Sequence, residues 1–327
     1  MMGRPLLPSR PAAPPVRSAL FVAGSDEAGL ENALTAGADM LILDLEEPQT
    51  PMTEAVRARA RALVAAFLDR LEPASTEPGR RPLLFCRVQP AHTGRMWPDL
   101  EACLRPSLTG VVVPKSYGPD DLVAADAVLT NAEGHVGREL GSTWIYPIFE
   151  TAEGIRRAHD IAVSSARVAY MGGAISRFGD IHQALGYRWT AEGGETHWLR
   201  SKLLADARAA GVRYPISGMW GGATDDTDGF RRFATELRDL GYHGMMLGDP
   251  AHVPLAHEVF TPTPDEVAYW RTLVELGDEA ERAAGPDDVP GPVLHGDPNQ
   301  GEAHVVHGAH VASARLNLEW ARALGVA

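Results

Sequence analysis

The sequence predicts an α/β protein, a (β/α)8 TIM barrel with a C-terminal helical appendage. Eight short apolar runs recur along the chain, mostly separated by segments with apolar residues at helical spacing. Strands that are apolar throughout and alternate with helices indicate a parallel sheet buried on both faces. Eight such units over ~230 residues fit a barrel in number and length. An open doubly wound sheet is the alternative, weakened because no G-x-G-x-x-G turn follows the first run.

Four strands and two helices are expected in the first half of the barrel. Gly24–Ser25–Asp26 supplies a turn and an N-cap for the first helix. The second helix carries apolar residues at helical spacing and several arginines. In order, the elements are strand 19–23, a helix ending at 36, strand 40–48, helix 53–71, loop 72–82, strand 83–89 and strand 110–115.

The second half repeats the pattern and leads into the appendage. Its predicted elements are strand 144–150, helix 153–164, strand 167–173, helix 195–210, strand 214–220, helix 227–240, strand 243–249, helix 265–284, loop 285–300 and helix 311–324. Nothing after residue 284 fits the barrel ring. We therefore predict a Pro- and Arg-rich disordered leader at 1–16, a barrel domain at 17–284, and a linker with a helical tail at 285–327.

Composition and charge narrow the classes of function. The 327 residues carry a net charge of −13, which disfavours nucleic acid or an anionic membrane surface as a partner. No apolar run reaches the ~18 residues of a membrane span. Cys86 and Cys103 form no paired motif, which argues against a disulfide framework and thiolate zinc and suits the reducing cytoplasm. We expect a cytoplasmic enzyme.

Charged side chains follow the predicted strands at the end where barrels place their active sites. They are Asp44, Glu46, Glu47, Arg87, Lys115, Glu150 and, in a later loop, Asp180. Oxygen ligands without cysteine or clustered histidine suit Mg²⁺, with Mn²⁺ as the alternative ion, better than zinc. A single carboxylate at a strand end is more often a helix cap or an ion-pair partner. The residue types alone therefore leave a structural network as the alternative to a functional site.

Two charged features have structural explanations beside the functional ones. Arg87 interrupts an apolar run, so its guanidinium either pairs with a barrel carboxylate or binds an anionic ligand. The acidic stretch Asp225–Asp228 lacks the glycine and distal glutamate of a calcium loop and precedes a predicted helix. We predict that it caps that helix.

A series of short motifs occurs in order between Arg17 and Val267. They are Arg17–Ser18–x–Leu20–Phe21–Val22, Leu43–Asp44–Leu45–Glu46, Arg87–Val88, Gly110–Val111–Val112–Val113–Pro114–Lys115, Glu150–Thr151–Ala152–Glu153–Gly154, Gly179–Asp180 and Phe260–Thr261–Pro262. Together they resemble the citrate lyase β-subunit-like branch of the HpcH/HpaI aldolase superfamily. The resemblance implies a (β/α)8 barrel that makes or breaks a carbon–carbon bond next to a carbonyl, usually on an acyl-CoA or a 2-oxo acid. It also implies a homo-oligomer, a trimer or hexamer.

The resemblance implies roles for individual residues as well. Glu150 and Asp180 would hold Mg²⁺. Glu46 and Glu47 would orient metal-bound water or the acyl group. The substrate would be bound by Arg87, which grips its carboxylate, together with Arg17, Lys115 and Glu150.

Three departures from the family pattern concern the predicted active end and the tail. A longer loop, 172–180, precedes the metal aspartate, and 245–250 replaces a Lys-x-x-Ile-His-Pro motif. Ala312 stands where relatives with malate-synthase-type chemistry place an aspartate, which argues against thioester hydrolysis.

Three hypotheses follow. The first is a Mg²⁺-dependent lyase that cleaves or forms a 3-hydroxyacyl-CoA or related hydroxy acid with a 2-oxo acid fragment. The second is a CoA-independent aldolase acting on a pyruvate-type 2-oxo acid. The third, motivated by the altered loops, is a catalytically degenerate barrel that serves as a binding subunit.

Overall fold

The structure is a computed structural model that describes residues 10–76, 81–173, 175–283, 293–296 and 303–327. The chain divides into two compact units, 1–260 and 261–327. We predicted a division after residue 284. The observed one falls earlier because the helix at 264–283 packs against the last helix of the chain, inside the second unit.

The first unit contains the predicted parallel barrel. Its strands are β1 (Ser18–Ala23), β2 (Met40–Asp44), β3 (Leu83–Arg87), β4 (Gly110–Val113), β5 (Trp144–Phe149), β6 (Gly172–Gly173), β7 (Ile216–Met219) and β8 (Gly244–Leu247). They pair in the order β6-β5-β4-β3-β2-β1-β8-β7, and every pair is parallel. This confirms the (β/α)8 class.

The ring closes between β6 and β7 through two backbone hydrogen bonds. Ile216 N donates to Met171 O at 3.2 Å, and Met219 N donates to Ile175 O at 3.1 Å. A Cβ on Gly172 would lie 2.2 Å from Ile216 O. Only glycine therefore lets the two backbones approach closely enough to close the barrel.

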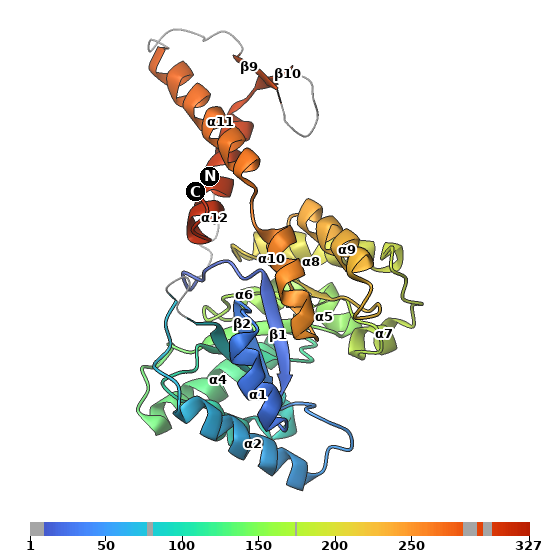
Figure 1. Cartoon of the computed structure of the whole chain (residues 1–327). Helices are drawn as coiled ribbons and strands as arrows, with labels where there is room; N and C mark the ends of the chain where they lie inside the picture. Colours follow the sequence, from blue (N-terminus) through green and yellow to red (C-terminus); the bar gives the residue numbers. More distant parts are fainter. Residues whose placement is uncertain (1–9, 77–80, 174, 284–292, 297–302) are drawn as a thin grey trace. The chain divides into compact units, whose positions relative to one another are not determined.

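Helices lie on the outside of the strands (Figure 1). In the first unit they are α1 (Glu27–Thr35), α2 (Glu54–Asp69), α3 (Met96–Cys103), α4 (Pro119–Val136), α5 (Ala152–Arg156), α6 (Ala158–Val163), α7 (Asp180–Leu185), α8 (His197–Ala209), α9 (Thr227–Leu240) and α10 (Val253–Phe260), with 3-10 turns η1 (Ala91–Thr93), η2 (Gly194–Thr196) and η3 (Pro250–His252). Side-chain caps begin several of them. Asp26 caps α1 and Asp226 caps α9, which confirms the predicted capping roles.

Strand alternation separates two apolar layers. Leu41 and Leu43 of β2 face outward to the helices, whereas Met40 and Ile42 belong to the cluster inside the barrel. Aromatic rings fill that interior: Phe85, Tyr146 and Tyr170 lie with ring centroids 6.0–6.4 Å apart. The packed interior supports the strand ends above it.

Local differences from the predicted elements occur mainly around β6. Strand 167–173 is reduced to the two residues of β6 and an isolated bridge between Val168 and Ile145. Arg167 instead joins a buried network with Glu133 and Asp126. The predicted helix 153–164 is two helices, α5 and α6, that meet at Arg157. Helices α3, α4, α7 and α10 were not among the predicted elements.

The segment before β1 makes specific contacts within the first unit. Arg10 donates hydrogen bonds to the carbonyl oxygens of Ala162, Ser165 and Ala210, and Pro14 O accepts one from Tyr170. Residues 1–9 of the predicted leader lie outside the described residues.

The second unit is a helical pair with a small hairpin. Helices α11 (Pro264–Ala283) and α12 (Gly308–Ala323) pack through Val267, Leu318 and Ala321. The predicted loop 285–300 contains part of an antiparallel hairpin, β9 (Val293–Gly296) with β10 (Ala303–Val306). Residues with strand propensity, Val293–Leu294 and Val305–Val306, pair directly across it.

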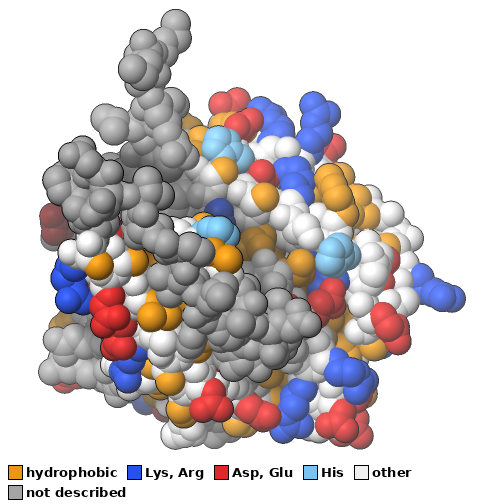
Figure 2. Space-filling view, turned by 90° about the horizontal axis from the view of Figure 1, so that it is seen from above, with side chains coloured by type: hydrophobic (Ala, Val, Ile, Leu, Met, Phe, Trp, Pro, Cys, Tyr) orange, Lys and Arg blue, Asp and Glu red, His pale blue; other side chains and the backbone are white. Residues whose placement is uncertain are grey.

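Charge of both signs is spread over the surface in Figure 2, where red and blue side chains intermingle rather than forming one patch. Among the described residues, no helix is both long and apolar enough to span a membrane.

Candidate active site

The site begins where β2 and β3 end side by side. Strand pairing sets Asp44 opposite Arg87, and alternation turns both side chains to the inner face, in line with Ile42 and Phe85. Arg87 Nε donates to Asp44 Oδ1 at 2.9 Å, and its Nη2 donates to Oδ2 at 2.7 Å. The two residues therefore form a bidentate ion pair, the geometry in which a guanidinium binds a carboxylate best.

The Arg87 guanidinium has two further neighbours. Its Nη1 lies 3.0 Å from Glu46 Oε2, and its plane lies over the Phe21 ring at 5.2 Å. Of its five N–H donors, two hydrogen-bond Asp44 in the described structure, and Glu46 Oε2 pairs with Nη1 by charge without a hydrogen bond. Donors are therefore left for an anionic ligand, so the two interpretations offered for Arg87 are compatible.

Asp44 also shapes the turn that follows β2. Its Oδ1 accepts hydrogen bonds from the backbone N–H groups of Glu46 at 3.0 Å and Glu47 at 3.3 Å. Gln89 holds the same turn by donating from Nε2 to Glu46 O at 2.7 Å. This Asx-type turn directs the Glu46 side chain inward, where it is almost fully buried.

Lys115 connects the neighbouring strand ends. It follows β4 in a left-handed backbone conformation, with φ +51°. Its Nζ lies 2.9 Å from Glu46 Oε1, 2.8 Å from Glu47 Oε1 and 3.3 Å from Asp180 Oδ2. Its backbone N–H donates to Glu150 Oε1 at 3.1 Å. One residue thus contacts four of the carboxylates at this end: Glu46, Glu47, Glu150 and Asp180.

Glu150 is held by the turn between β5 and α5. Thr151 caps α5 by accepting from Gly154 N at 2.9 Å, and its hydroxyl donates to Ser116 O at 3.1 Å. A Cβ on Gly154 would lie 2.4 Å from Ser116 O, so this close approach requires glycine. The sequence Glu-Thr-Ala-Glu-Gly therefore fixes the backbone position from which the Glu150 side chain extends.

The electrostatics of Glu150 are strongly perturbed. Burial is the largest cause that raises its pKa, from 4.5 to about 8, and the negative charges of Glu46 and Asp180 raise it further against the opposing effects of Arg87 and Lys115. Burial also raises the pKa of Glu46. Carboxylates with raised pKa values in a group are typical of functional sites.

Asp180 reaches the site from the first turn of α7. Its side chain is one-third exposed. The residue before its glycine, Phe178, has φ +66° and is 80% exposed. Arg177 stacks over the Phe178 ring at 4.7 Å and over Trp189 at 5.5 Å.

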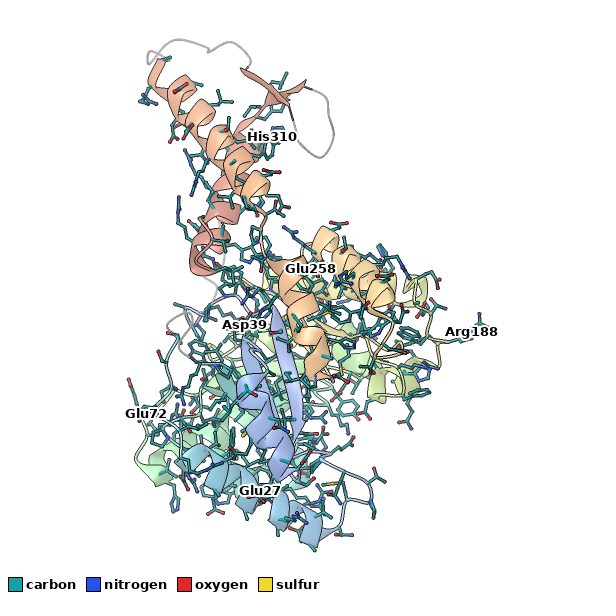
Figure 3. The ribbon with its side chains drawn as sticks, viewed as in Figure 1. Glu27, Asp39, Glu72, Arg188, Glu258 and His310 are labelled. Atoms are coloured by element: carbon teal, nitrogen blue, oxygen red, sulfur yellow. The ribbon has the colours of Figure 1, made fainter. Side chains whose placement is uncertain are left out.

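Arg17 is the one predicted site residue that the structure does not bring to this end. It precedes β1, so parallel strands place it at the opposite end of the barrel. There it pairs with Asp39, with Nη2 to Oδ1 at 2.7 Å and Nε to Oδ2 at 2.9 Å. Figure 3 labels Asp39 at one end of β1 and Glu27, on the helix that follows β1, at the other.

Two residues that shape the site, Asp44 and Phe21, have no role that their sequence positions alone predicted. Asp44 was noted as a strand-end charge, and its pairing with Arg87 could have been found by aligning the ends of β2 and β3. Phe21 lies two residues before the end of β1, on the same face as Ala19. In the sequence, the alternation of Phe21 with Leu20 and Val22 could have placed its ring on the inner face of the barrel.

The donor set fits a hard divalent cation. Glu46, Glu150 and Asp180 offer carboxylate oxygens around one mouth, and Glu46 Oε2 is buried without a hydrogen-bond partner in the described structure. Within the described residues, no three ligands are already gathered at metal distance. The Lys115 ammonium instead lies among these carboxylates.

Comparison with known proteins adds an independent observation. The family model described as HpcH/HpaI aldolase/citrate lyase matches residues 17–250. The chain is 31% identical over 266 residues to citrate lyase subunit beta of Haemophilus influenzae, which covers 81% of this chain and 87% of that protein. It is 30% identical over 291 residues to the L-malyl-CoA/beta-methylmalyl-CoA lyase of Cereibacter sphaeroides, covering 83% and 87%.

A solved structure supports the fold. CitE from Mycobacterium tuberculosis, in complex with magnesium, acetoacetate and coenzyme A, aligns with a TM-score of 0.65 at 21% identity. The alignment covers 95% of this chain and 99% of that one.

Proposed function

The chain belongs to the HpcH/HpaI aldolase/citrate lyase family of carbon–carbon lyases, and from this premise we propose that it is Mg²⁺-dependent. The reaction is the reversible cleavage of a 3-hydroxyacyl-CoA, or a related hydroxy acid, to an acetyl-type fragment and a 2-oxo acid. The observation that carries the proposal is the convergence of Glu46, Glu150 and Asp180 with Arg87 at one barrel mouth. The M. tuberculosis relative was crystallised with magnesium and coenzyme A, and the C. sphaeroides relative is a malyl-CoA lyase.

Glu150 and Asp180 are the proposed metal ligands. Both carboxylates lie beside Lys115 and reach the mouth from adjacent strand–helix units. Bound Mg²⁺ would supply positive charge for the oxygen anion that develops as the carbon–carbon bond breaks. Mn²⁺ has similar ligand preferences and would substitute for it.

Arg87 is the proposed carboxylate-binding residue. Asp44 locks its Nε–Nη2 edge, which fixes the guanidinium plane before substrate arrives. The N–H donors that Asp44 does not engage would bind a substrate carboxylate in a defined orientation. Glu46 and Glu47 would orient the acyl group or water, and Lys115 would add a second positive charge near the substrate.

The experiment is an assay of cleavage and condensation with Mg²⁺. A panel of 3-hydroxyacyl-CoA thioesters and free 2-oxo acids is incubated with protein, and thioester and oxo-acid products are followed by chromatography. Arg87→Lys should lower kcat/KM about 100-fold, because an ammonium cannot reproduce a bidentate contact. Exposed Arg70→Lys is the matched control and should leave it unchanged. Absence of turnover with every substrate, from protein that binds the metal, would sink the lyase proposal.

Calorimetry separates the second hypothesis from the first. A CoA-independent aldolase acting on a 2-oxo acid predicts heat on binding the oxo acid and none on binding CoA. The first hypothesis requires affinity for CoA.

A further inference from the structure

Lys115 has an unusual, left-handed backbone conformation. Its φ of +51° is in the left-handed region, which L-residues other than glycine and asparagine visit rarely. Such conformations persist where surrounding contacts over-determine them, and they cluster at functional sites. Here the contacts are the backbone N–H on Glu150 and the ammonium on Glu46, Glu47 and Asp180.

Positive charge is scarce around this ammonium. Among the described residues, the mouth gathers five carboxylates, Asp44, Glu46, Glu47, Glu150 and Asp180, and the cations that pair with them there are Arg87 and Lys115. Arg87 is committed to Asp44 and Glu46. In the described structure, Lys115 is the cation that contacts Asp180. A metal bound to Asp180 would place its positive charge close to the Lys115 ammonium.

We propose that Lys115 is an internal counter-cation that competes with the metal for Asp180 and is displaced when a divalent cation binds. The inference rests on the proposed metal site at Glu150 and Asp180. A metal ligated by Asp180 at ~2.1 Å and an ammonium beside the same carboxylate repel each other. The compact ammonium on its flexible four-carbon stem can withdraw toward Glu47, whose side chain is 54% exposed.

The displacement has a consequence for substrate binding. In the metal-free protein Lys115 neutralises part of the carboxylate group and holds four strand ends together. Once displaced from Asp180, it keeps its contacts with Glu46 and Glu47 and presents its charge beside the metal site. Metal binding would thus create a second cationic contact for an anionic substrate.

The test measures metal binding directly and needs no turnover. Free Mn²⁺ is quantified by electron paramagnetic resonance during titration of the full-length protein. Lys115→Met should bind Mn²⁺ at least ~10-fold more tightly than the natural protein, because the competing charge is gone. Without metal, Lys115→Met should melt at a lower temperature than the natural protein. Adding Mn²⁺ should raise the melting temperature of the variant by more than it raises that of the natural protein. Lys202→Met changes the other lysine of the chain, which pairs with Asp206 on α8, and should match the natural protein.

A second variant guards against misfolding. Lys115→Gly adopts the left-handed backbone without strain and keeps the N–H that Glu150 accepts. It should also bind Mn²⁺ more tightly.

The outcomes distinguish this inference from the proposed function. If the natural protein binds Mn²⁺, Glu150→Gln does not, and both Lys115 variants bind no more tightly, the competition is refuted while the metal site stands. If neither the natural protein nor the Lys115 variants bind Mn²⁺, both proposals fall. Tighter binding by the variants supports the displacement.

Discussion

At the scale of the residue, Glu150 is a buried carboxylate that is repelled by its carboxylate neighbours. Its backbone position is fixed by the Thr151 cap and the close approach at Gly154. The carboxylate lies near Glu46 and Asp180, whose negative charges add to the effect of burial in raising its pKa. A group with this constraint is suited to bind a cation, since the cation removes the conflict.

The same constraint predicts how stability depends on pH without metal. The pKa of Glu150 is about 8 in the folded protein against 4.5 ordinarily. Between these values the folded state binds more protons than the unfolded state, so stability should fall as pH rises from about 4.5 to about 8. Melting temperatures in chelator at intervals across this range measure the slope. Glu150→Gln keeps the acceptor for Lys115 N and should reduce the slope. An unchanged slope in that variant would assign the effect to other groups.

Residue types alone could not establish this environment. The sequence places Glu150 at a strand end, but its pKa also depends on Glu46, which lies 104 positions earlier, and on Asp180, which lies 30 positions later. Arg17 shows the converse. It precedes the first strand, so strand direction alone assigns it to the opposite end, and the motif resemblance concealed this.

At the scale of the element, β6 and the loop after it depart most from the regular pattern. Periodicity predicts a strand over 167–173, but the structure keeps Gly172–Gly173 and an isolated bridge between Val168 and Ile145. Long apolar runs such as 40–44 were predictable since burial on both faces determines their composition. The shortening of β6 was not predictable, because an apolar run does not specify which of its residues pair.

The loop between β6 and α7 contains a second left-handed residue, Phe178, with φ +66° and 80% exposure. Asparagine tolerates this conformation and a β-branched residue does not. Phe178→Val should therefore be less stable than Phe178→Asn by about 1–2 kcal/mol. For a protein of this size the difference corresponds to ~2–4 °C per kcal/mol in melting temperature. Equal melting temperatures would show that the backbone is not held left-handed at 178.

At the scale of the whole molecule, the candidate site belongs to one compact unit. Every residue proposed to bind metal or substrate lies between Glu46 and Asp180, inside the unit that ends at residue 260. The eight-strand pattern made this barrel predictable. The boundary was not, because helix 264–283 continues the chain without a break in composition and only its packing on α12 assigns it to the second unit.

This division predicts that metal binding survives removal of the second unit. A chain ending at Phe260 retains the closed ring of strands and α10, and the excised helices keep their own core of Val267, Leu318 and Ala321. The shortened protein should show cooperative thermal unfolding by circular dichroism and bind Mn²⁺ within about threefold of the full chain, since no ligand has been removed. The same truncation carrying Glu150→Gln is the control and should not bind. A truncated barrel that folds but does not bind Mn²⁺ would contradict this prediction.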